Sequence, residues 1–272
     1  MQSFSVCMSV YLNDKPADFV VAVRSIVQQT APPDEIVLVV DGPVSAELEH
    51  IIIELQIEIP VLTVIRLSKN MGHAIARQTA LEAAKNEIVA IMDSDDVAMP
   101  FRFERQLALL HEHPEISVVG GNITEFVDHI NNVVGAREVP QNDGEIKAYM
   151  KMRCPMNLVT VMLRKADVQA VGGYIDWYCE EDYYLWIRLS LQGYKFYNIQ
   201  EHLVHVRVGK EMYSRRGGWR YFKSEARLQT YMWRQRIISL PRFSFNVTGR
   251  FAIQVLMPNS VRGFVFQKLF RK

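Results

Sequence analysis

Three aspartates within four residues are the side chains in this chain best suited to carry out chemistry. Asp93, Asp95 and Asp96 follow directly on the apolar run 88–92, which has the pattern of a strand covered on both faces. Three adjacent carboxylates repel one another and cannot be buried without a partner. Their hard oxygen atoms suit Mg2+ or Mn2+, so the motif predicts a metal site. An Asp-rich turn between a strand and a helix is the simpler alternative.

Two further strand ends carry polar groups. Asp41 follows the apolar run 35–40 and could accept a hydrogen bond from a nucleobase or a ribose, or could serve as a turn aspartate. Lys69 and Gly72 stand just before a predicted helix, where backbone N–H groups and a nearby cation favour phosphate. Arg77, about one turn into that helix, could reach the same anion. A capped helix with a solvated Lys and Arg is the alternative.

A second acidic run opens a predicted helix. Glu180, Glu181 and Asp182 are consecutive, and the helix dipole favours acids in a first turn by about 0.3–1 kcal/mol each. Capping alone could explain one or two of them, but three exceed what capping needs. Beside a metal–diphosphate site, one of these carboxylates could act as a general base.

The elements that must position these residues alternate between strands and helices in the first hundred residues. Periodicity predicts strands at 4–11, 35–40, 61–67 and 88–92, with helices at 17–29, 48–55 and 74–84 between them. Such alternation predicts a mostly parallel sheet of right-handed βαβ units, with ligands at the carboxyl ends of its strands. Beyond Asp96 the pattern is mixed: we expect strands through 118–119 and at 133–139 and 159–163, a turn or bulge at 120–121, and helices at 144–152 and 180–191.

The overall composition is that of a globular protein. With 272 residues, 49% hydrophobic and 22% charged, the chain can bury a sizeable core as one large domain or as one domain with an extension. The odd number of cysteines, without metal-ligand spacing, favours a reduced cytosolic setting, with Cys7 and Cys154 in the core. No signal peptide is visible, and no apolar stretch approaches the roughly 20 residues that span a bilayer.

Charge is strongly polarised along the chain. Residues 201–272 carry 15 Lys and Arg against three acids, whereas residues 1–200 carry 16 against 27. This asymmetry predicts an acidic or phosphate-bearing partner for the basic end: a phospholipid surface, a diphosphate or a nucleic acid. Arg215 and Arg216, in a Gly-rich loop, could clamp a diphosphate or a lipid headgroup. Segment 241–272 mixes basic residues with Phe, which suits an anionic membrane surface or a C-terminal helix with a basic outer face.

Five motifs occur together in the order and spacing of family 2 glycosyltransferases: VCMSVY, VVDGP, KNMGHAIARQ, IMDSDDVAMP and GGYIDWYCEEDYYLW. Residues 4 to about 210 therefore resemble that family. The stretch RVGKEMYSRRGGWRYFKSE is similar to its exopolysaccharide branch, including amylovoran-type transferases. The resemblance implies an α/β fold of the GT-A type, Rossmann-like with a mostly parallel central sheet and helices on both faces. It also implies inverting transfer of a sugar from a nucleotide diphosphate, with UDP favoured by family habit.

The resemblance further implies a role for each matching residue on the donor side. Ser9, Tyr11 and Asp41 would hold the base and the ribose. Asp93 and Asp95 match the Asp-x-Asp motif, in which Asp95 would bind Mn2+ or Mg2+ and Asp93 the ribose or the metal. Three residues match the nucleotide-contacting loop and helix: Lys69, Gly72 and Arg77.

On the acceptor side, Asp182 matches the base that deprotonates the acceptor hydroxyl. Glu181 is a rival for this role, because the acidic run is one residue longer than the Glu-Asp pair of the family. Relatives place a His shortly after the Arg matched by Arg207, but Val and Gly follow it here, and His205 is only a weak substitute as a metal ligand. Three arginines are expected to contact the diphosphate or the acceptor: Arg207, Arg215 and Arg216.

We expect a GT-A domain at 1–210, with a nucleotide-binding half at about 1–100 and an acceptor-binding half at about 101–210, followed by a basic, aromatic-rich extension at 211–272. The predicted protein is a metal-dependent, inverting glycosyltransferase that adds a sugar to a lipid-linked oligosaccharide for a surface polysaccharide. It would work as a peripheral protein on the inner face of the cytoplasmic membrane, with a nucleotide-sugar donor and no nucleic-acid partner.

Two alternatives stay open. A phosphatase of the haloacid dehalogenase type would use Asp93 as its nucleophile, because the apolar strand and the run 93–97 fit the Asp-x-Asp-x-Val signature. Three strand–helix units precede the motif here, whereas that family usually begins with it. The other alternative is a non-catalytic, membrane-bound scaffold that binds a sugar nucleotide without turning it over.

Overall fold

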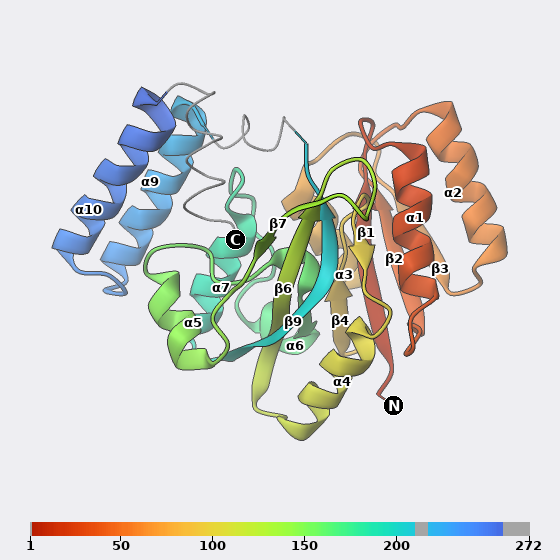
Figure 1. The fold of residues 1–272 in the computed structure, drawn as a ribbon, viewed down its shortest axis with the longest axis horizontal. Coiled ribbons are helices and arrows are strands. Elements are labelled where there is room, and N and C mark those ends of the chain that lie inside the picture. Colours follow the sequence, from red (N-terminus) through yellow and green to blue (C-terminus); the bar gives the residue numbers. More distant parts are fainter. Residues whose placement is uncertain (1, 210–216, 258–272) are drawn as a thin grey trace.

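The first hundred residues form a parallel half-sheet. The structure is a computed structural model that describes residues 2–209 and 217–257 (Figure 1). Four strands pair in parallel in the order β3-β2-β1-β4: β1 (Phe4–Val10), β2 (Glu35–Val40), β3 (Leu62–Arg66) and β4 (Ile88–Ile91). The connecting helices are α1 (Pro16–Val27), α2 (Ala46–Glu58) and α3 (His73–Ala83). These elements confirm the predicted βαβ alternation, and all four strands end at one edge of the sheet.

The second half of the sheet mixes parallel and antiparallel pairs. Its strands are β5 (Val97–Ala98), β6 (Ile116–Phe126), β7 (Val133–Arg137), β8 (Met162–Arg164) and β9 (Lys195–Arg207). β8 lies antiparallel between β4 and β6, and β9 runs parallel to β6 while pairing antiparallel with β5. β7 folds back on β6 as a hairpin. The predicted predominance of parallel pairs therefore holds only for the first half. Because β6 and β9 run in the same direction as β4, they end at the same edge.

Helices cover both faces of the sheet. The remaining helical elements are α4 (Arg102–Glu112), α5 (Asp143–Met150), η1 (Leu158–Thr160), α6 (Lys165–Ala170), α7 (Glu181–Leu191), α9 (Trp219–Arg234), α10 (Leu240–Phe251) and η2 (Ala252–Leu256). Alternate residues of β2 enter two different cores, as side chains on a strand must. Ile36 and Leu38 pack with Phe19 of α1, whereas Val37 and Val39 belong to the cluster that contains Trp186 of α7.

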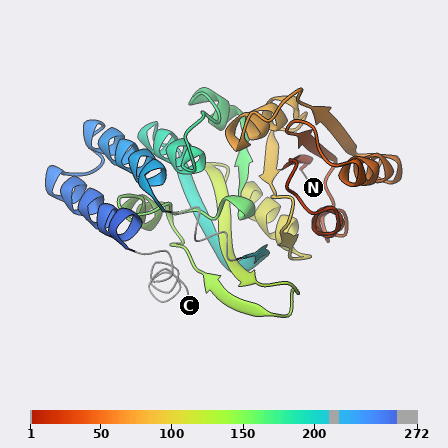
Figure 2. The same ribbon diagram turned by 90° about the horizontal axis from the view of Figure 1, so that it is seen from above.

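Residues 217–257 of the basic C-terminal part are folded onto this second core. α9 and α10 form a helical hairpin beside α7 (Figure 2), and Leu228 and Met232 of α9 share the buried cluster of Trp186. The predicted division of the chain at residue 210 remains a prediction. Within residues 2–209 and 217–257, no helix combines the length and the apolarity that crossing a bilayer requires.

One predicted strand is wrong in detail. The run 159–163 forms a turn of 3-10 helix, η1, before the short strand β8. Thr160 explains the break, because its hydroxyl accepts the N–H of Gly121 at 3.0 Å and donates to Asn157 O at 2.7 Å. The expected bulge is confirmed in β6, whose register shifts next to Gly121.

Candidate active site

The aspartate turn after β4 lies at the edge where the strands end, and its three carboxylates are not equivalent. Asp96 is buried and accepts the backbone N–H of Arg207 at 2.8 Å, so it anchors the turn to β9. The backbone carbonyl of Asp95 accepts a hydrogen bond from the Nε–H of Arg207 at 3.2 Å. Ser94 donates to the carboxylate of Asp14 at 2.9 Å. The turn is therefore held by its neighbours through Ser94, Asp96 and the backbone of Asp95, whereas the carboxylates of Asp93 and Asp95 take no part in these contacts.

The electrostatics of Asp95 fit a bound cation. Burial, followed by the charges of Asp93 and Asp14, raises the pKa of Asp95 to about 6, and Arg207 offsets this only in part. The side chain of Asp93 is 37% exposed. In the part of the chain that the structure describes, no group of three or more His, Cys, Asp or Glu side chains is arranged to hold an ion. One or two carboxylates completed by substrate phosphates are a usual Mg2+ environment, and Asp93 and Asp95 fit that arrangement.

Asp41 holds the loop after β3. One carboxylate oxygen accepts the N–H of Met71 at 2.6 Å and the other accepts the N–H of Gly72 at 2.9 Å. Gly72 has φ +90° and precedes the first residue of α3, a conformation that L side chains rarely adopt. Under this loop, a Cβ on Gly42 would meet the backbone N of Asn70 at 2.5 Å. The two loops are thus packed against each other, and Asp41 fixes the backbone at the start of α3.

Arg77 joins the two acidic runs of the sequence. Its Nη2 lies 3.2 Å from Oδ1 of Asp93, and its Nη1 lies 2.7 Å from Oε1 of Glu181. Burial opposes the charge of this guanidinium, but Asp93, Glu181 and Asp182 outweigh it and raise its pKa. A buried charge needs such partners. Through this one side chain, α3, the aspartate turn and the start of α7 meet.

The two candidates for a general base have different surroundings. Glu181 accepts from Arg77, as described above. Burial and the neighbouring charge of Glu181 raise the pKa of Asp182 to about 6, while Arg77 and the N–H of Tyr183 act in the opposite direction. Sγ of Cys154 lies 3.8 Å from Oδ2 of Asp182. A carboxylate with such a pKa is mostly ionised at neutral pH and more basic than an ordinary Asp.

The other predicted residues are only partly brought together. Tyr11 lies at the end of β1, edge-on to His73 with ring centroids 6.1 Å apart, and Ser9 lies within β1. Lys69 is exposed in the loop that Asp41 fixes. His205 contacts Thr124 through Nδ1 and lies opposite Val97 in β9, where β5 pairs with it.

Arg207 is held by contacts within the protein. Its Nη2 lies 3.0 Å from Asp18 and its Nη1 donates to the carbonyl of Asp128 at 2.9 Å. Its guanidinium also lies over the ring of Phe126, 4.7 Å from the centroid. Most of its donors are thus engaged within the protein, which leaves little of it for a diphosphate. The other two predicted arginines, Arg215 and Arg216, lie outside the described residues.

Sequence reasoning missed two side chains at this edge. Asp14 accepts both the N–H of Tyr11 and the hydroxyl of Ser94, and its pKa is raised, chiefly by burial. His73 begins α3, and loss of solvent followed by the charge of Arg77 lowers its pKa. Asp14 could have been found, because it follows the carboxyl end of the first predicted strand. His73 belongs to the motif KNMGHAIARQ, but nothing in the sequence indicates that this histidine lies beside the aspartate turn.

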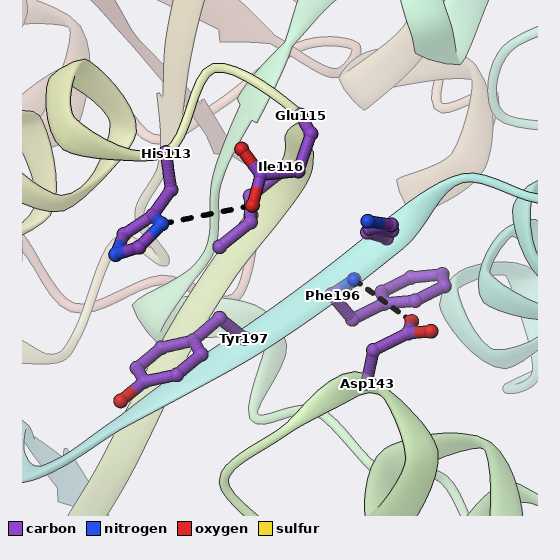
Figure 3. A pocket seen from close by; sticks show the side chains of 7 residues that line it. His113, Glu115, Ile116, Asp143, Phe196 and Tyr197 are labelled. Carbon is purple, nitrogen blue, oxygen red and sulfur yellow. Dashed lines mark hydrogen bonds and ion pairs between the residues drawn. The ribbon is translucent and has the colours of Figure 1, made fainter.

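A surface hollow elsewhere is not the candidate site. It is lined by residues that include His113, Ile116, Asp143 and Phe196 (Figure 3). It lies where β6 and β9 begin, at the opposite edge of the sheet from Asp95. Its polar contacts are local: Asp143 accepts the N–H of Phe196 at 3.1 Å, and His113 lies 3.6 Å from Glu115.

A parallel half-sheet with an Asp-x-Asp turn at its carboxyl edge is the architecture of GT-A glycosyltransferases, and solved structures confirm the fold. Staphylococcus aureus TarS 1–349 in complex with UDP-GlcNAc aligns with a TM-score of 0.69 at 19% identity, over 96% of this chain and 78% of that one. The mannosyltransferase PcManGT from Pyrobaculum calidifontis, in complex with GDP-Man and Mn2+, aligns with a TM-score of 0.65 at 15% identity, over 95% and 71%. At such identities the likeness concerns the fold alone.

The sequence comparisons identify the family. The family described as "Glycosyl transferase family 2" matches residues 5–216. An uncharacterized glycosyltransferase of Haemophilus influenzae is 39% identical over 99% of both chains. The amylovoran biosynthesis glycosyltransferase AmsE of Erwinia amylovora is 34% identical over 97% of this chain and 98% of its own. The UDP-Gal:alpha-D-GlcNAc-diphosphoundecaprenol beta-1,3-galactosyltransferase of Escherichia coli is 33% identical over 99% and 97%. The chain belongs to glycosyl transferase family 2, and the predicted resemblance is confirmed.

Proposed function

We propose that this glycosyltransferase moves a sugar from a UDP-sugar to a hydroxyl of a lipid-linked saccharide, with inversion and with a divalent metal, during surface polysaccharide synthesis. The observation that carries the proposal is the contact of Arg77 with both Asp93 and Glu181, because it brings the metal motif next to the candidate base Asp182. The name of the E. coli relative supports a UDP-sugar donor and a diphosphoundecaprenol-linked acceptor, and that of the E. amylovora relative supports a role in polysaccharide synthesis. Such an acceptor would place the enzyme at the inner face of the cytoplasmic membrane.

On the donor side, Asp95 and Asp93 would hold Mn2+ or Mg2+ together with oxygens of the diphosphate. The bound ion would act as a Lewis acid and neutralise charge on the leaving diphosphate. The backbone around Gly72, fixed by Asp41, and the exposed side chain of Lys69 would contact the nucleotide at the N-terminal end of α3. Three further residues complete the proposed nucleotide site: Ser9, Tyr11 and Arg77.

On the acceptor side, Asp182 would remove the proton from the attacking hydroxyl. Its pKa of about 6 leaves it ionised at neutral pH and basic enough to accept a proton in the transition state. Glu181 is the weaker candidate, because Arg77 occupies its carboxylate at 2.7 Å. A single displacement at the anomeric carbon then inverts that centre, with no covalent intermediate on the protein.

The test is release of UDP or GDP from a panel of nucleotide sugars, with Mn2+, Mg2+ or EDTA, and with a short-chain, water-soluble GlcNAc-diphospho-lipid as acceptor. Wild type is compared with Asp95→Ala and Asp182→Asn, and with Asp176→Asn as a control at an exposed aspartate of the loop that precedes α7. We expect metal-dependent release from one donor, lost in the first two variants and kept in the third. NMR of the product should show an inverted anomeric centre.

Two results would contradict parts of this proposal. Donor binding without turnover on any acceptor would favour the non-catalytic scaffold. Full activity of Asp182→Asn alongside an inactive Asp95→Ala would leave the metal site standing and move the base to Glu181.

A further inference from the structure

Large apolar side chains are exposed at one end of the helical hairpin. Trp219 is 58% exposed and Leu256 is 66% exposed. The Trp219 ring packs against Phe222 and Phe251, with centroids 5.9 and 5.7 Å apart. The N–H of Gly218 donates to the carbonyl of Gln254 at 2.9 Å, which ties the start of α9 to η2. An exposed cluster of this kind usually marks an interaction surface.

Basic side chains border this cluster along α9. Arg220, Lys223 and Arg227 follow one another at helical spacings of three and four residues and therefore share a face. The guanidinium of Arg220 lies 4.0 Å from the ring centroid of Tyr178, and that of Arg227 lies 4.3 Å from that of Trp177. None of the three makes an ion pair with a carboxylate among residues 2–209 and 217–257. Stacking on a ring leaves the N–H edges of a guanidinium free for phosphate.

This end of the hairpin lies at the same edge of the molecule as the candidate active site. The hydroxyl of Ser224 donates to the carbonyl of Tyr178 at 2.6 Å, and Nε1 of Trp177 donates to the carbonyl of Ser224 at 3.3 Å. Tyr178 stands four residues before Asp182. Figure 1 shows the start of α9 at the end of the molecule toward which β1, β6 and β9 run.

The tip of the β6–β7 hairpin exposes further apolar residues at this edge. β6 ends at Phe126, next to the carboxyl end of β9, and the turn that follows carries Ile130. Val133 and Val134 continue the apolar surface, and these three side chains are 39%, 49% and 53% exposed. Two separate parts of the fold therefore present apolar side chains beside the site.

We infer that this edge docks on an anionic phospholipid surface, with Trp219 and Leu256 at the depth of the headgroups and Arg220 and Lys223 on lipid phosphates. Charge complementarity selects this occupant, because loop 174–179 offers a single acid, Asp176, against the three cations of α9. Trp at the level of the headgroups with neighbouring Lys and Arg is the usual composition of an interfacial anchor. When the protein is docked in this way, the start of α7 lies close to the bilayer, where the hydroxyl of a lipid-linked acceptor would be presented. That consequence rests on the proposed function.

The opposite end of the hairpin is the competing surface. It exposes Trp233, Leu240 and Phe245, with Arg234 and Arg236 nearby, but it lies away from the loop that carries Tyr178. A matched pair of double variants therefore separates the two ends: Arg220→Gln with Lys223→Gln, and Arg234→Gln with Arg236→Gln.

The experiment is flotation of the full chain with vesicles of neutral phosphatidylcholine, alone or mixed with anionic phosphatidylglycerol. We expect binding to the anionic vesicles only. Each cation near such a surface contributes about 1 kcal/mol, so the Arg220/Lys223 variant should show a partition coefficient about thirtyfold lower. Trp219→Ser should weaken binding as well, while the Arg234/Arg236 variant should bind nearly as wild type.

Activity keeps this inference distinct from the proposed function. The Arg220/Lys223 variant should retain transfer to the short-chain, water-soluble acceptor and lose most of its transfer to the same saccharide embedded in vesicles. Equal partition to neutral and anionic vesicles, or loss of binding in the Arg234/Arg236 variant alone, would overturn the inference. Absence of transfer to any acceptor would refute the proposed function and leave the vesicle result to decide the docking surface.

Discussion

Replacement of Arg77 by Met should destabilise the fold and raise the pH at which the enzyme becomes active. Methionine is of similar length and keeps the packing of the aliphatic stem, but it leaves Asp93 and Glu181 without their shared cation. Arg77→Lys is the matched control, because it keeps the charge and gives up the two-sided contact of the guanidinium.

The size of the effect follows from the exposure of the three side chains. Arg77 is 10% exposed and Glu181 is 13% exposed, whereas Asp93 is 37% exposed. Loss of one partner of a buried pair costs about 3–5 kcal/mol, while a solvent-exposed pair contributes about 0–1 kcal/mol. The Glu181 contact therefore dominates, and Arg77→Met should lower the free energy of unfolding by about 3 kcal/mol at pH 7. Adding Glu181→Gln should recover part of this, because it removes the unpaired carboxylate.

Urea unfolding and the pH dependence of kcat measure the two consequences separately. Arg77 lowers the pKa of Asp182, so its removal should move that pKa above about 6. Because the ionised carboxylate is the active form of the base, the acid limb of kcat should shift to higher pH. Arg77→Met should then lose more activity at pH 6.5 than at pH 8. An unfolding free energy within about 0.5 kcal/mol of wild type, together with an unmoved acid limb, would refute the reasoning.

The remaining predictions concern the base, one glycine and the hairpin. Asp182→Asn should lower kcat about 10²–10⁴-fold. The folded-state pKa of Asp182, about 6, exceeds its ordinary value near 3.9, so the stability that its protonated form contributes is lost as the pH rises through 6. In urea, Asp182→Asn should therefore gain up to about 3 kcal/mol at pH 7.5 and little at pH 4. At Gly72, φ is +90° and an added Cβ would meet open space, so Gly72→Ala should lower the free energy of unfolding by about 1–3 kcal/mol through backbone strain alone. Calorimetry should also show weaker nucleotide binding by this variant. Gly144→Ala within α5 is the control and should be neutral or stabilising. Arg250→Met removes the cation 3.1 Å from Glu225, in a pair only 15% and 12% exposed, and should cost about 3 kcal/mol in urea.

Much of the donor half could be predicted from the sequence because its signals are local. The run 35–40 is apolar throughout and bounded by Pro-Pro and Asp-Gly-Pro, and β2 spans those same residues. The topology then needs no further information: parallel strands joined by helices end at one edge, so Asp41, Gly72 and Asp93 had to come near one another.

What the sequence could not predict depends on contacts between distant residues. The three aspartates of the turn are alike in sequence, yet only the carboxylate of Asp96 accepts the backbone N–H of Arg207, 111 positions away. The role of Asp41 in holding the base or the ribose stays a prediction, but nothing in the sequence indicated that each of its oxygens also accepts a backbone N–H of the neighbouring loop. The mixed half of the sheet was missed in detail because β5 and β8 span only two and three residues, over which periodicity is weak, and because the register between β6 and β9 is irregular.

The acidic run 180–182 shows why three consecutive carboxylates occur where capping needs only one or two. Glu180 is buried, and burial followed by the charges of Glu225 and Asp182 raises its pKa, while Arg250 and a hydrogen bond with Tyr221 act in the opposite direction. It therefore faces the helical hairpin.

Glu181 is held by Arg77 of the donor half, and Asp182 follows these two anchored residues in the chain. The carboxylate proposed as the base is thus positioned from one side by the nucleotide-binding half and from the other by the hairpin proposed to dock on the bilayer. A displacement of either part would move the start of α7, because both contacts are made within two residues of Asp182. With Asp182 as the proposed base, the three acids would serve as two anchors and one reacting group, which would explain why the run is longer than a helix cap requires.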